Sequence, residues 1–338
     1  MKKNILVVGC GFSGSVIARE LANIGYQVTI IDKRDHIGGN CYDYVNEYGI
    51  RVHMYGPHLF HTRNKDVFDY LSKFTEWVEY KHKVKAILSN GQYVTLPVNQ
   101  ETSDIVGKDN VVDTFIRPYT KKMWGMDIED IDPDILNRVP IRSDMNDLYF
   151  PDDEYQFMPK DGYTKLFENL LDHPNIIVKL NTPFDPEMEC NYDYVFNSMP
   201  IDQYWCNAYG ELPYRSIKFH TVSLPLPKLL PETTVNFTHS GKFTRMTEWK
   251  NIPNHGENDM FTTITYEEPC DYQDNSYERY YPVKDKNGAN RERYKQYKSI
   301  NSPNVKFIGR CGLYAYLNMD QAVSSALSIA KEFIQNDK

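Results

Sequence analysis

Residues 4–34 read "NILVVGCGFSGSVIARELANIGYQVTIIDKR" and predict a strand, a glycine turn, a helix and a second strand. The unbroken apolar run Ile5–Val8 is typical of a buried strand in a parallel sheet. Gly9, Gly11 and Gly14 follow it with the spacing G-x-G-x-x-G. The first glycine permits the tight turn, the second lets a pyrophosphate approach the backbone, and the third lets the helix pack on the strand. The helix would then present its positive N-terminal end to the phosphates.

The residues after the second strand indicate which dinucleotide is bound. Asp32 ends the expected strand Val28–Ile31, where its carboxylate is placed to bind a ribose hydroxyl. Gly38-Gly39 offers a second close backbone approach, which a simple nicotinamide domain does not need. The arrangement resembles FAD-binding proteins of the amine-oxidase and glutathione-reductase type; the alternative is a plain turn before the next strand. We therefore expect non-covalently bound FAD.

The end of the chain predicts elements that complete the same domain. Val305–Ile308 reads as a strand that ends at Gly309-Arg310, and an amphipathic helix begins near Asp320. The FAD-binding domain is therefore expected to be discontinuous, formed by residues 1–80, 155–215 and 300–338.

The middle of the chain predicts a sheet. Lys83–Leu96 reads as a hairpin around Asn90-Gly91, and Thr221–Tyr266 contains β-rich runs. We assign residues 81–97, 141–154 and 216–299 to an antiparallel sheet domain and residues 98–140 to a reduced helical lid segment. The expected fold class is α/β, with a discontinuous FAD-binding Rossmann-like domain, a small helical segment and an antiparallel β-sheet domain.

Composition narrows the function classes. The chain has 338 residues and a net charge of -8, which argues against a broad nucleic-acid surface but not against a local basic pocket. No segment approaches the ~20 apolar residues of a membrane span. The six cysteines form no C-x-x-C pair, and no Cys/His group has zinc spacing, so we expect no metal site. Scattered thiols fit a reducing, cytoplasmic compartment.

Basic and aromatic residues recur together in the middle of this acidic chain. Arginine matches phosphate oxygens with a planar fork, and tyrosine adds hydroxyl donors and stacking faces. The pattern indicates a pocket for a diphosphate. Its members are Arg138, Arg142, Tyr149, Arg215, Asn236, Arg245, Tyr281 and Tyr316.

Taken together, these stretches resemble the UDP-galactopyranose mutase family. The matching segments include "VVGCGFSG", "IDKRDHIGGNCY", "YGPHLFHT", "YTKKMWG", "NRVPIR", "DGYTKL", "PIDQYW", "FTRMTEWK", "YYPV" and "GRCGLYAYLNMDQAVSSAL". They occur in the family's order and cover nearly the whole chain, which is far more specific than any single motif.

The resemblance implies an isomerase that acts through covalent catalysis by a cofactor. Such enzymes interconvert UDP-galactopyranose and UDP-galactofuranose, which supplies galactofuranose for surface glycans. The flavin must be reduced, by NAD(P)H or dithionite, and its N5 attacks the anomeric carbon and expels UDP. The expected partner is a UDP-galactose-type sugar nucleotide, with no nucleic acid and no membrane.

The resemblance also assigns residues to roles. The catalytic set is Arg138, Arg245 and His61. The substrate-binding set is Phe115, Tyr119, Thr120, Trp124, Arg138, Tyr149, Arg215, Asn236, Arg245, Tyr281, Tyr316 and Asn318. The cofactor-binding set is Gly9, Gly11, Phe12, Ser13, Gly14, Asp32, Lys33, Gly38, Gly39, Asn40, His58, His61, Gly309, Arg310, Met319 and Asp320. For His58 and His61, a purely structural buried role is the alternative.

The chain departs from the family in two places. The stretch from Pro97 to Tyr119 is much shorter than in the bacterial mutases, whose longer version carries the dimer contact. It leaves room for one short helix, so we expect a monomer or a dimer on another surface. Asn318 stands where an active-site aspartate is common, and an amide keeps a hydrogen bond but loses the charge.

Three other functions remain open from the sequence. The same mutase chemistry could act on UDP-N-acetylgalactosamine or a dTDP-6-deoxy sugar. An amine-oxidase-type flavin oxidoreductase would explain the cofactor domain but not the arginines and tyrosines. The third is a non-catalytic sugar-nucleotide binding protein, which an inability to bind FAD would favour.

Overall fold

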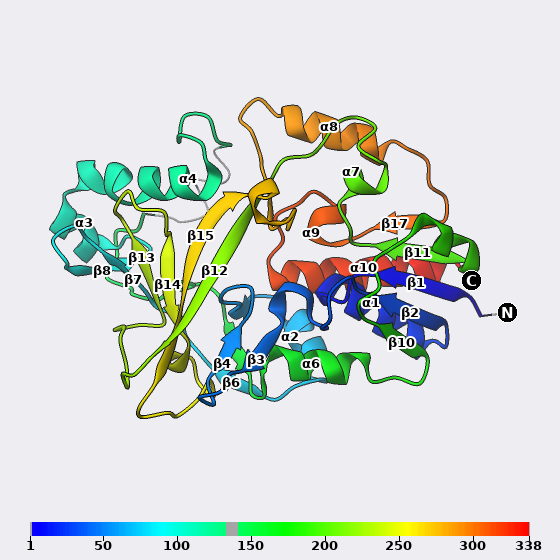
Figure 1. The fold of residues 1–338 in the computed structure, drawn as a ribbon, viewed down its shortest axis with the longest axis horizontal. Helices are drawn as coiled ribbons and strands as arrows, with labels where there is room; N and C mark the ends of the chain where they lie inside the picture. The colour runs from blue at the N-terminus through cyan, green and yellow to red at the C-terminus, as the bar shows by residue number, and fades with distance from the viewer. Residues whose placement is uncertain (1, 133–140, 338) are drawn as a thin grey trace.

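The computed structural model describes residues 2–132 and 141–337. One side of the molecule is a five-stranded parallel sheet with the order β10-β2-β1-β11-β17 (Figure 1). Its strands are β1 (Asn4–Val8), β2 (Gln27–Ile31), β10 (Ile176–Lys179), β11 (Tyr194–Asn197) and β17 (Val305–Phe307). The strands expected at both ends of the chain therefore lie in one sheet, with β11 between β1 and β17.

Helices from both ends of the chain cover this sheet. Helix α1 (Phe12–Asn23) packs against α10 (Met319–Asn336), and Figure 1 shows the red C-terminal helix beside the blue N-terminal elements. Helix α6 (Gly162–Leu171) also packs on α1. Ile5 and Val7 of β1 belong to one core cluster with the buried apolar residues of α1 and α6. The expected discontinuous Rossmann-like fold is confirmed.

The other side of the molecule is a seven-stranded sheet with the order β16-β12-β15-β14-β13-β7-β8. Its strands are β7 (Val84–Ile87), β8 (Tyr93–Leu96), β12 (Tyr214–Leu224), β13 (Thr234–Phe237), β14 (Arg245–Glu248), β15 (Thr262–Asp271) and β16 (Tyr281–Pro282). The expected β7–β8 hairpin is present.

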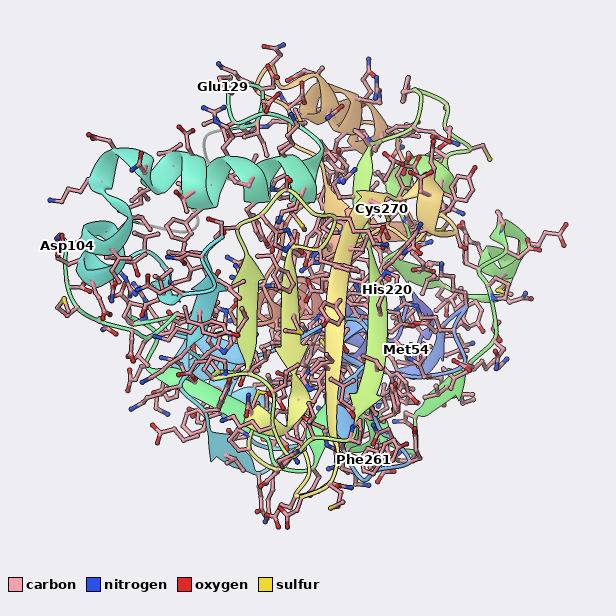
Figure 2. The ribbon with its side chains drawn as sticks, turned by 60° about the vertical axis from the view of Figure 1, so that its left-hand side comes forward. Met54, Asp104, Glu129, His220, Phe261 and Cys270 are labelled. Atoms are coloured by element: carbon pink, nitrogen blue, oxygen red, sulfur yellow. The ribbon has the colours of Figure 1, made fainter. Side chains whose placement is uncertain are left out.

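This sheet is not entirely antiparallel as expected, because β13 pairs with β7 in parallel. Parallel strands need a long crossover connection, and more than a hundred residues separate these two. Local turn signals reveal hairpins but carry no information about such a distant pairing. Figure 2 shows the long strands of this sheet, with Cys270 near one end of β15 and Phe261 at the other.

The helical segment crosses one end of this sheet (Figures 1 and 2). It contains α3 (Gln100–Val106), a short turn, a π-helical stretch η3 (Val112–Ile116) and α4 (Arg117–Trp124). The segment therefore contains α3 in addition to the single short helix that the sequence led us to expect. The signal for α3 was Asn99, whose side chain accepts a hydrogen bond from the N–H of Thr102 and so caps the helix.

The chain also forms two small sheets. They are β3 (Asp43–Val45) with β4 (Arg51–His53), and β5 (Phe60–Thr62) with β9 (Tyr155–Pro159) and β6 (Trp77–Glu79). The other α-helices in the described parts of the chain are α2 (Lys65–Leu71), α7 (Ile201–Tyr204), α8 (Ala289–Lys298) and α9 (Gly309–Gly312). Helix α8 contacts α7, and its Tyr297 shares a core cluster with Tyr214 of β12. The segments β4 and β5 flank the loop that carries His58.

Candidate functional site

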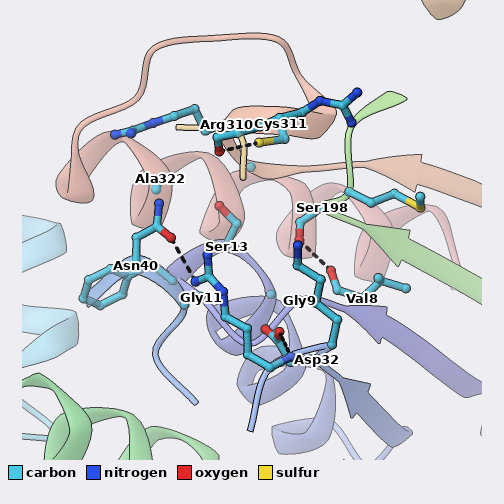
Figure 3. A pocket seen from close by; sticks show the side chains of 18 of the residues that line it. Val8, Gly9, Gly11, Ser13, Asp32, Asn40, Ser198, Arg310, Cys311 and Ala322 are labelled. Atoms are coloured by element: carbon cyan, nitrogen blue, oxygen red, sulfur yellow. Dashed lines mark hydrogen bonds between the residues drawn. The ribbon is translucent and has the colours of Figure 1, made fainter. Parts of the chain in front are cut away.

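A cavity of about 380 Å³ opens at the glycine turn between β1 and α1 (Figure 3). Its wall comes from the carboxyl ends of the parallel strands, where open α/β sheets bind ligands. Fourteen residues of the expected cofactor set line it, namely Gly9, Gly11, Phe12, Ser13, Gly14, Asp32, Lys33, Gly38, Gly39, Asn40, His58, Gly309, Arg310 and Met319.

The glycine turn has the geometry that a dinucleotide needs. Gly9 has a φ of +100°, which favours glycine, and a Cβ on Gly14 would lie 2.0 Å from the carbonyl oxygen of Gly9. Helix α1 begins after Gly11 with no side-chain cap and no acidic residue in its first turn. Its first backbone N–H groups therefore face the cavity without a side-chain acceptor, which suits a phosphate.

The acid after β2 is held in place by backbone groups. Oδ2 of Asp32 accepts the N–H of Cys10 at 2.8 Å, and Oδ1 accepts the N–H of Arg34 at 3.0 Å. The Arg34 side chain donates to Asn40 at 2.9 Å and pairs with Glu278 at 2.9 Å. Burial lowers the pKa of Arg34, but Tyr55 and Glu278 raise it more. Asp32 and Arg34 thus form a fixed polar wall beside the turn.

The two expected histidines lie in different places. His58 lines the cavity, and its Nδ1 donates to the carbonyl oxygen of Gly56 at 2.9 Å. Burial, and less strongly the charges of Arg310 and Arg245, lower the pKa of His58 to about 4. His58 is therefore neutral at pH 7.

His61 and Asp320 do not line this cavity. Nδ1 of His61 donates to Oδ2 of Asp153 at 2.5 Å, and the ring stacks on Phe150 at 3.5 Å between centroids. Asp320 accepts the hydroxyl of Thr62 at 2.9 Å. Both residues lie in hydrogen-bonded positions near β5, outside the wall that surrounds the glycine turn.

A second cavity, of about 120 Å³, lies between the helical segment and the large sheet. Most of its wall is apolar or aromatic, and it holds six residues of the expected substrate set. They are Phe115, Tyr119, Thr120, Trp124, Tyr149 and Asn236.

Arg245 on β14 is an electrostatic neighbour of residues at both cavities. Its charge acts on His58 at the larger cavity and on Tyr119 at the smaller. Nε of Arg245 lies 2.8 Å from Oε2 of Glu267, whose side chain is 2% exposed. Burial lowers the pKa of Arg245, but Glu267 and Tyr119 raise it more, so it stays well above its ordinary value. A permanent cation therefore stands near both cavities.

Three neighbouring strands place buried polar side chains in a row. In the sheet register Asn236 of β13 faces Arg245 of β14, which faces Glu267 of β15. Within residues 2–132 and 141–337, Oδ1 of Asn236, Nε of Arg245 and Oε1 of Glu267 are buried and lack a good hydrogen bond. Buried polar atoms of this kind are rare in native proteins and call for a ligand or water.

Arg310 connects the larger cavity to two of the expected tyrosines. Its guanidinium lies 5.0 Å from the ring of Tyr281 and 5.1 Å from that of Tyr316, and these rings stack on each other. The ring of Trp124 meets Tyr281 edge-on at 6.2 Å. Arg310 also donates to the carbonyl of Leu317 at 2.7 Å. Figure 3 shows Arg310 at the edge of the larger cavity.

Arg215 lies in a different setting from the other expected substrate residues. Its Nε donates to the carbonyl of Met123 at 2.8 Å and its Nη2 to that of Lys122 at 3.2 Å, so it caps the C-terminal end of α4. The ammonium of Lys122 donates to three carbonyls of residues 237–243, and burial lowers its pKa to about 8. These two cations fasten α4 to the sheet.

Asn318 is the N-cap of α10 and also lines the larger cavity. Its side chain and that of Gln321 form a capping box, in which Oε1 of Gln321 accepts the N–H of Asn318 at 2.9 Å. Asparagine and aspartate cap helices about equally well, so the amide preserves this structural role. Arg138 lies outside the described residues.

Sequence reasoning missed several residues at these sites. Ser198 and Met199 follow β11, Glu278 and Arg279 precede β16, and all four line the larger cavity. Their side chains have no motif around them, and only the pairing of distant strands brings them to the glycine turn. Glu267 was also missed, although its alternation with buried threonines on β15 was a weak signal.

The residues in the described ranges contain no group of three His, Cys, Asp or Glu side chains arranged to hold a metal ion. In the same ranges, no helix combines the length and the apolar character needed to cross a bilayer.

Comparisons with known proteins agree with this architecture. A family model described as UDP-galactopyranose mutase matches residues 114–316, and one described as an NAD(P)-binding Rossmann-like domain matches residues 7–74. A UDP-galactopyranose mutase of Mycoplasma pneumoniae is 32% identical, with 99% of this chain and 97% of the relative aligned. A dTDP-fucopyranose mutase of Escherichia coli is 34% identical, with 99% of each chain aligned.

Solved structures share the fold. A reduced UDP-galactopyranose mutase superposes with a TM-score of 0.74 at 16% identity, covering 99% of this chain and 94% of the other. A wild-type putrescine oxidase superposes less closely, with a TM-score of 0.58 at 13% identity and 99% of each chain covered. Because the family model spans more than half of the chain and full-length relatives exceed 30% identity, the chain belongs to the UDP-galactopyranose mutase family.

Proposed function

We propose that this protein interconverts UDP-galactopyranose and UDP-galactofuranose, with FAD in the larger cavity and the sugar nucleotide extending into the smaller one. The observation that carries this proposal is the row of buried polar side chains Asn236, Arg245 and Glu267. Among the described residues, Oδ1 of Asn236 and Oε1 of Glu267 have no hydrogen-bond partner, and the charge of Arg245 acts on residues at both cavities. A dinucleotide turn and an aromatic pocket near one arginine suit a reaction that brings a nucleotide diphosphate to a flavin.

The larger cavity fits FAD better than a lone nucleotide. The uncapped start of α1 suits the pyrophosphate, Asp32 suits a ribose, and the cavity extends to His58 and Arg310 beyond the turn. Once bound and reduced, by NAD(P)H or dithionite, FAD would supply the nucleophile for the anomeric carbon. The proposed cofactor residues are those of the expected set that line this cavity.

The chain's own residues would bind and orient the substrate. Arg245 would neutralise charge on the diphosphate, both in the bound state and as UDP departs and returns. Tyr119 would stack on the base, and Tyr281 and Tyr316 would donate to phosphate oxygens. Arg138 is proposed as a second diphosphate cation from its sequence match alone. Arg215 would act by holding α4 in place, because its donors already bind helix carbonyls.

Contraction of the sugar ring moves one proton from the 4-hydroxyl oxygen to the former ring oxygen. A neutral histidine can accept and return such a proton. His61 donates from Nδ1 to Asp153, so its Nε2 carries a lone pair when the ring is neutral. His61 lines neither cavity, so it is proposed as a catalytic residue from its sequence match alone, with Nε2 as the atom that would exchange the proton.

The test is incubation of dithionite-reduced protein with UDP-galactose, followed by chromatography for the ring-contracted isomer. We expect conversion without net consumption of reductant, and none with fully oxidised protein. Equal turnover by the oxidised protein would refute the requirement for reduced flavin. Release of no FAD on denaturation would refute the cofactor assignment.

A second substrate class has support of its own. The dTDP-fucopyranose mutase of Escherichia coli is as similar to this chain as the UDP-galactopyranose mutases are. The decisive measurement is kcat/KM for dTDP-fucopyranose and UDP-N-acetylgalactosamine against UDP-galactopyranose under the same reducing conditions. The substrate with the highest kcat/KM identifies the sugar and base that the protein selects.

We further propose a monomer, or a dimer that does not use residues 98–118. The Mycoplasma pneumoniae alignment has 388 positions against 338 residues, so at least 50 positions of it face gaps in this chain. An obligate interface usually buries more than about 2,000 Å², which α3 and η3 cannot supply alone. Light scattering, which measures the mass of the particle in solution, tests this proposal.

The cysteines bear on where the protein works. Six free cysteines support a reducing, cytoplasmic location.

A further inference from the structure

Three histidines form a continuous hydrogen-bond chain beside the larger cavity. His53 ends β4, His58 lies five residues later in the cavity wall, and His255 comes from the loop between β14 and β15. The backbone N–H of His58 lies 3.1 Å from Nδ1 of His53, and Nε2 of His53 lies 2.9 Å from Nε2 of His255. His53 and His255 are each 1% exposed.

Only one arrangement of protons satisfies this chain when both rings are neutral. The carbonyl of Pro253 can only accept, so Nδ1 of His255 carries a hydrogen and its Nε2 is an acceptor. The N–H of His58 can only donate, so Nδ1 of His53 is an acceptor and its Nε2 carries a hydrogen. His53 therefore donates to His255. Neither residue has a choice of tautomer.

The surroundings keep both rings neutral and fixed. His53 packs against Trp249 at 4.9 Å and Tyr163 at 5.6 Å between ring centroids. The charge of Arg51 acts on both rings, but Arg51 pairs with Asp43, and its backbone N–H donates to the carbonyl of His255. Burial lowers the pKa of His255 to about 4 and that of His53 well below its ordinary value.

The same chain fixes the segment that carries His58. Gly56 has a φ of +82°, and a Cβ there would lie 2.7 Å from the ring of Phe219, so the turn is confined on that side. The ring of His58 donates to Gly56, and its backbone donates to His53. Without an acceptor at His53, the N–H of His58 would lose its partner in the interior, and the turn would lose its anchor.

We propose that His53 and His255 are positioning residues for the cofactor site, which together hold His58 and its turn in the one conformation that forms the cavity wall. The proposal rests on the proposed FAD site. Neither residue touches the cavity itself; each acts through the backbone of His58. His255 brings the large sheet into contact with the cofactor wall, because its loop connects two strands of that sheet.

The test compares His255→Leu with His255→Gln. The amide oxygen of glutamine can accept from Nε2 of His53, whereas leucine cannot. The control is His220→Leu, which alters a histidine on β12 whose side chain is 45% exposed. For each variant we would measure the FAD dissociation constant by reconstitution of the apoprotein, the flavin absorption spectrum, and the melting temperatures of apo- and holoprotein.

We expect His255→Leu to weaken FAD binding about ten-fold or more and to alter the flavin spectrum, while His255→Gln stays within about three-fold of the parent. If His255 positions the cofactor site, His255→Leu should reduce the rise in Tm that FAD binding gives, because stabilisation by a ligand depends on its affinity. A merely structural role would lower the apo and holo Tm equally. Unchanged FAD affinity and spectrum in a folded His255→Leu protein would overturn the proposal.

Nitrogen-15 NMR of labelled histidines keeps the proposal testable if His255→Leu fails to fold. The parent protein should show His53 protonated only at Nε2 and His255 only at Nδ1 at pH 7. Any other tautomer pair would overturn the chain. If the parent binds no FAD at all, the proposed function fails, and this outcome is distinct from both results above.

Discussion

The larger cavity is lined at its centre by the backbone of one continuous turn, whereas the smaller cavity is lined by side chains from separate segments. Gly9, Gly11 and Gly14 lie within six residues, and the N-terminus of α1 is part of the same motif. The smaller cavity joins η3 and α4 to β7, β8 and β13. Substitutions in the larger cavity should therefore act by blocking the approach of the ligand. Substitutions in the smaller cavity should act by removing side-chain contacts.

Gly11→Ala should produce the largest effect, which is loss of flavin from a folded protein. A Cβ on Gly11 would meet only the Cα of Gly39, at 3.8 Å, and its φ of -79° suits alanine. The methyl group would instead occupy the space where a pyrophosphate approaches. We expect FAD affinity to fall by about 100-fold or more while unfolding free energy changes by less than about 1 kcal/mol. Flavin absorbance and chemical denaturation measure the two.

Gly14→Ala is the matched contrast. Its Cβ would lie 2.0 Å from the carbonyl oxygen of Gly9, so the helix or the turn must move. Stability and FAD binding should fall together. Normal FAD binding by Gly11→Ala would mean that the phosphate does not approach the backbone at this turn. The larger cavity would then not differ from the smaller one in the way described above.

Acid should destabilise both regions for the same reason. Burial lowers the pKa of His58, at the larger cavity, to about 4, and that of His82, beside Tyr149, to about 3. Below pH 6.5 the unfolded chain takes up protons that the folded chain excludes, so stability is complete above pH 6.5 and falls as the pH drops toward 4. Each residue contributes about 1.4 kcal/mol per pH unit.

Denaturation at several pH values tests this contribution. Because carboxylates also titrate in this range, the informative quantity is the difference between the parent and His82→Gln. Between pH 6 and 4.5, the slope of the unfolding free energy against pH should be smaller in the variant by about 1.4 kcal/mol per pH unit, which is the contribution of one proton. Parallel slopes would show that His82 is not buried as a neutral ring.

Arg245→Ala should reduce kcat/KM by about one to two orders of magnitude, because a charge-assisted hydrogen bond contributes about 1.5–3 kcal/mol. Stability should fall as well, by about 3–5 kcal/mol, since Glu267 would remain buried and unpaired. Arg245→Lys should restore activity only in part, because lysine lacks the planar fork.

The double variant Arg245→Met with Glu267→Gln separates the two effects. It removes the buried charge together with its partner, so stability should recover while activity does not. FAD content should stay intact in all three proteins. Near-normal kinetics in Arg245→Ala would remove this residue from the substrate site.

The contrast between the cavities also explains what the sequence could reveal. The glycine turn, Asp32 and the closing helix α10 were predictable, because local spacing dictates their geometry. Glu278 reaches the same cavity only through the pairing of distant strands, and the parallel contact of β13 with β7 has no local signal. For the smaller cavity, the family resemblance indicated Tyr119 and Asn236, whereas only a weak alternation on β15 pointed to Glu267, the partner of Arg245.

Tyr119→Ala should weaken UDP binding about ten-fold while leaving FAD bound. Tyr119 lies on α4 and lines the smaller cavity, and base–aromatic stacking is worth ~1–3 kcal/mol. Titration calorimetry with UDP measures the change, with Tyr119→Phe as the control that keeps the stacking face. Unchanged UDP affinity in Tyr119→Ala would place the base elsewhere.

Asn318→Asp should produce the smallest effect. Aspartate caps a helix as well as asparagine does, and a negative charge at the N-terminus of α10 adds about 0.3–1 kcal/mol of stability. Since Asn318 also lines the larger cavity, the new charge would lie on the cofactor side, and Arg310 on the same wall would offset part of its repulsion toward an anionic substrate. We therefore expect Tm to rise slightly and kcat/KM to change by less than about three-fold, or about 0.6 kcal/mol. A change in kcat/KM above ten-fold, or a reversed preference between UDP-galactopyranose and dTDP-fucopyranose, would mean that the side chain at position 318 contacts the sugar. The substrate site would then extend from the smaller cavity to the N-terminus of α10.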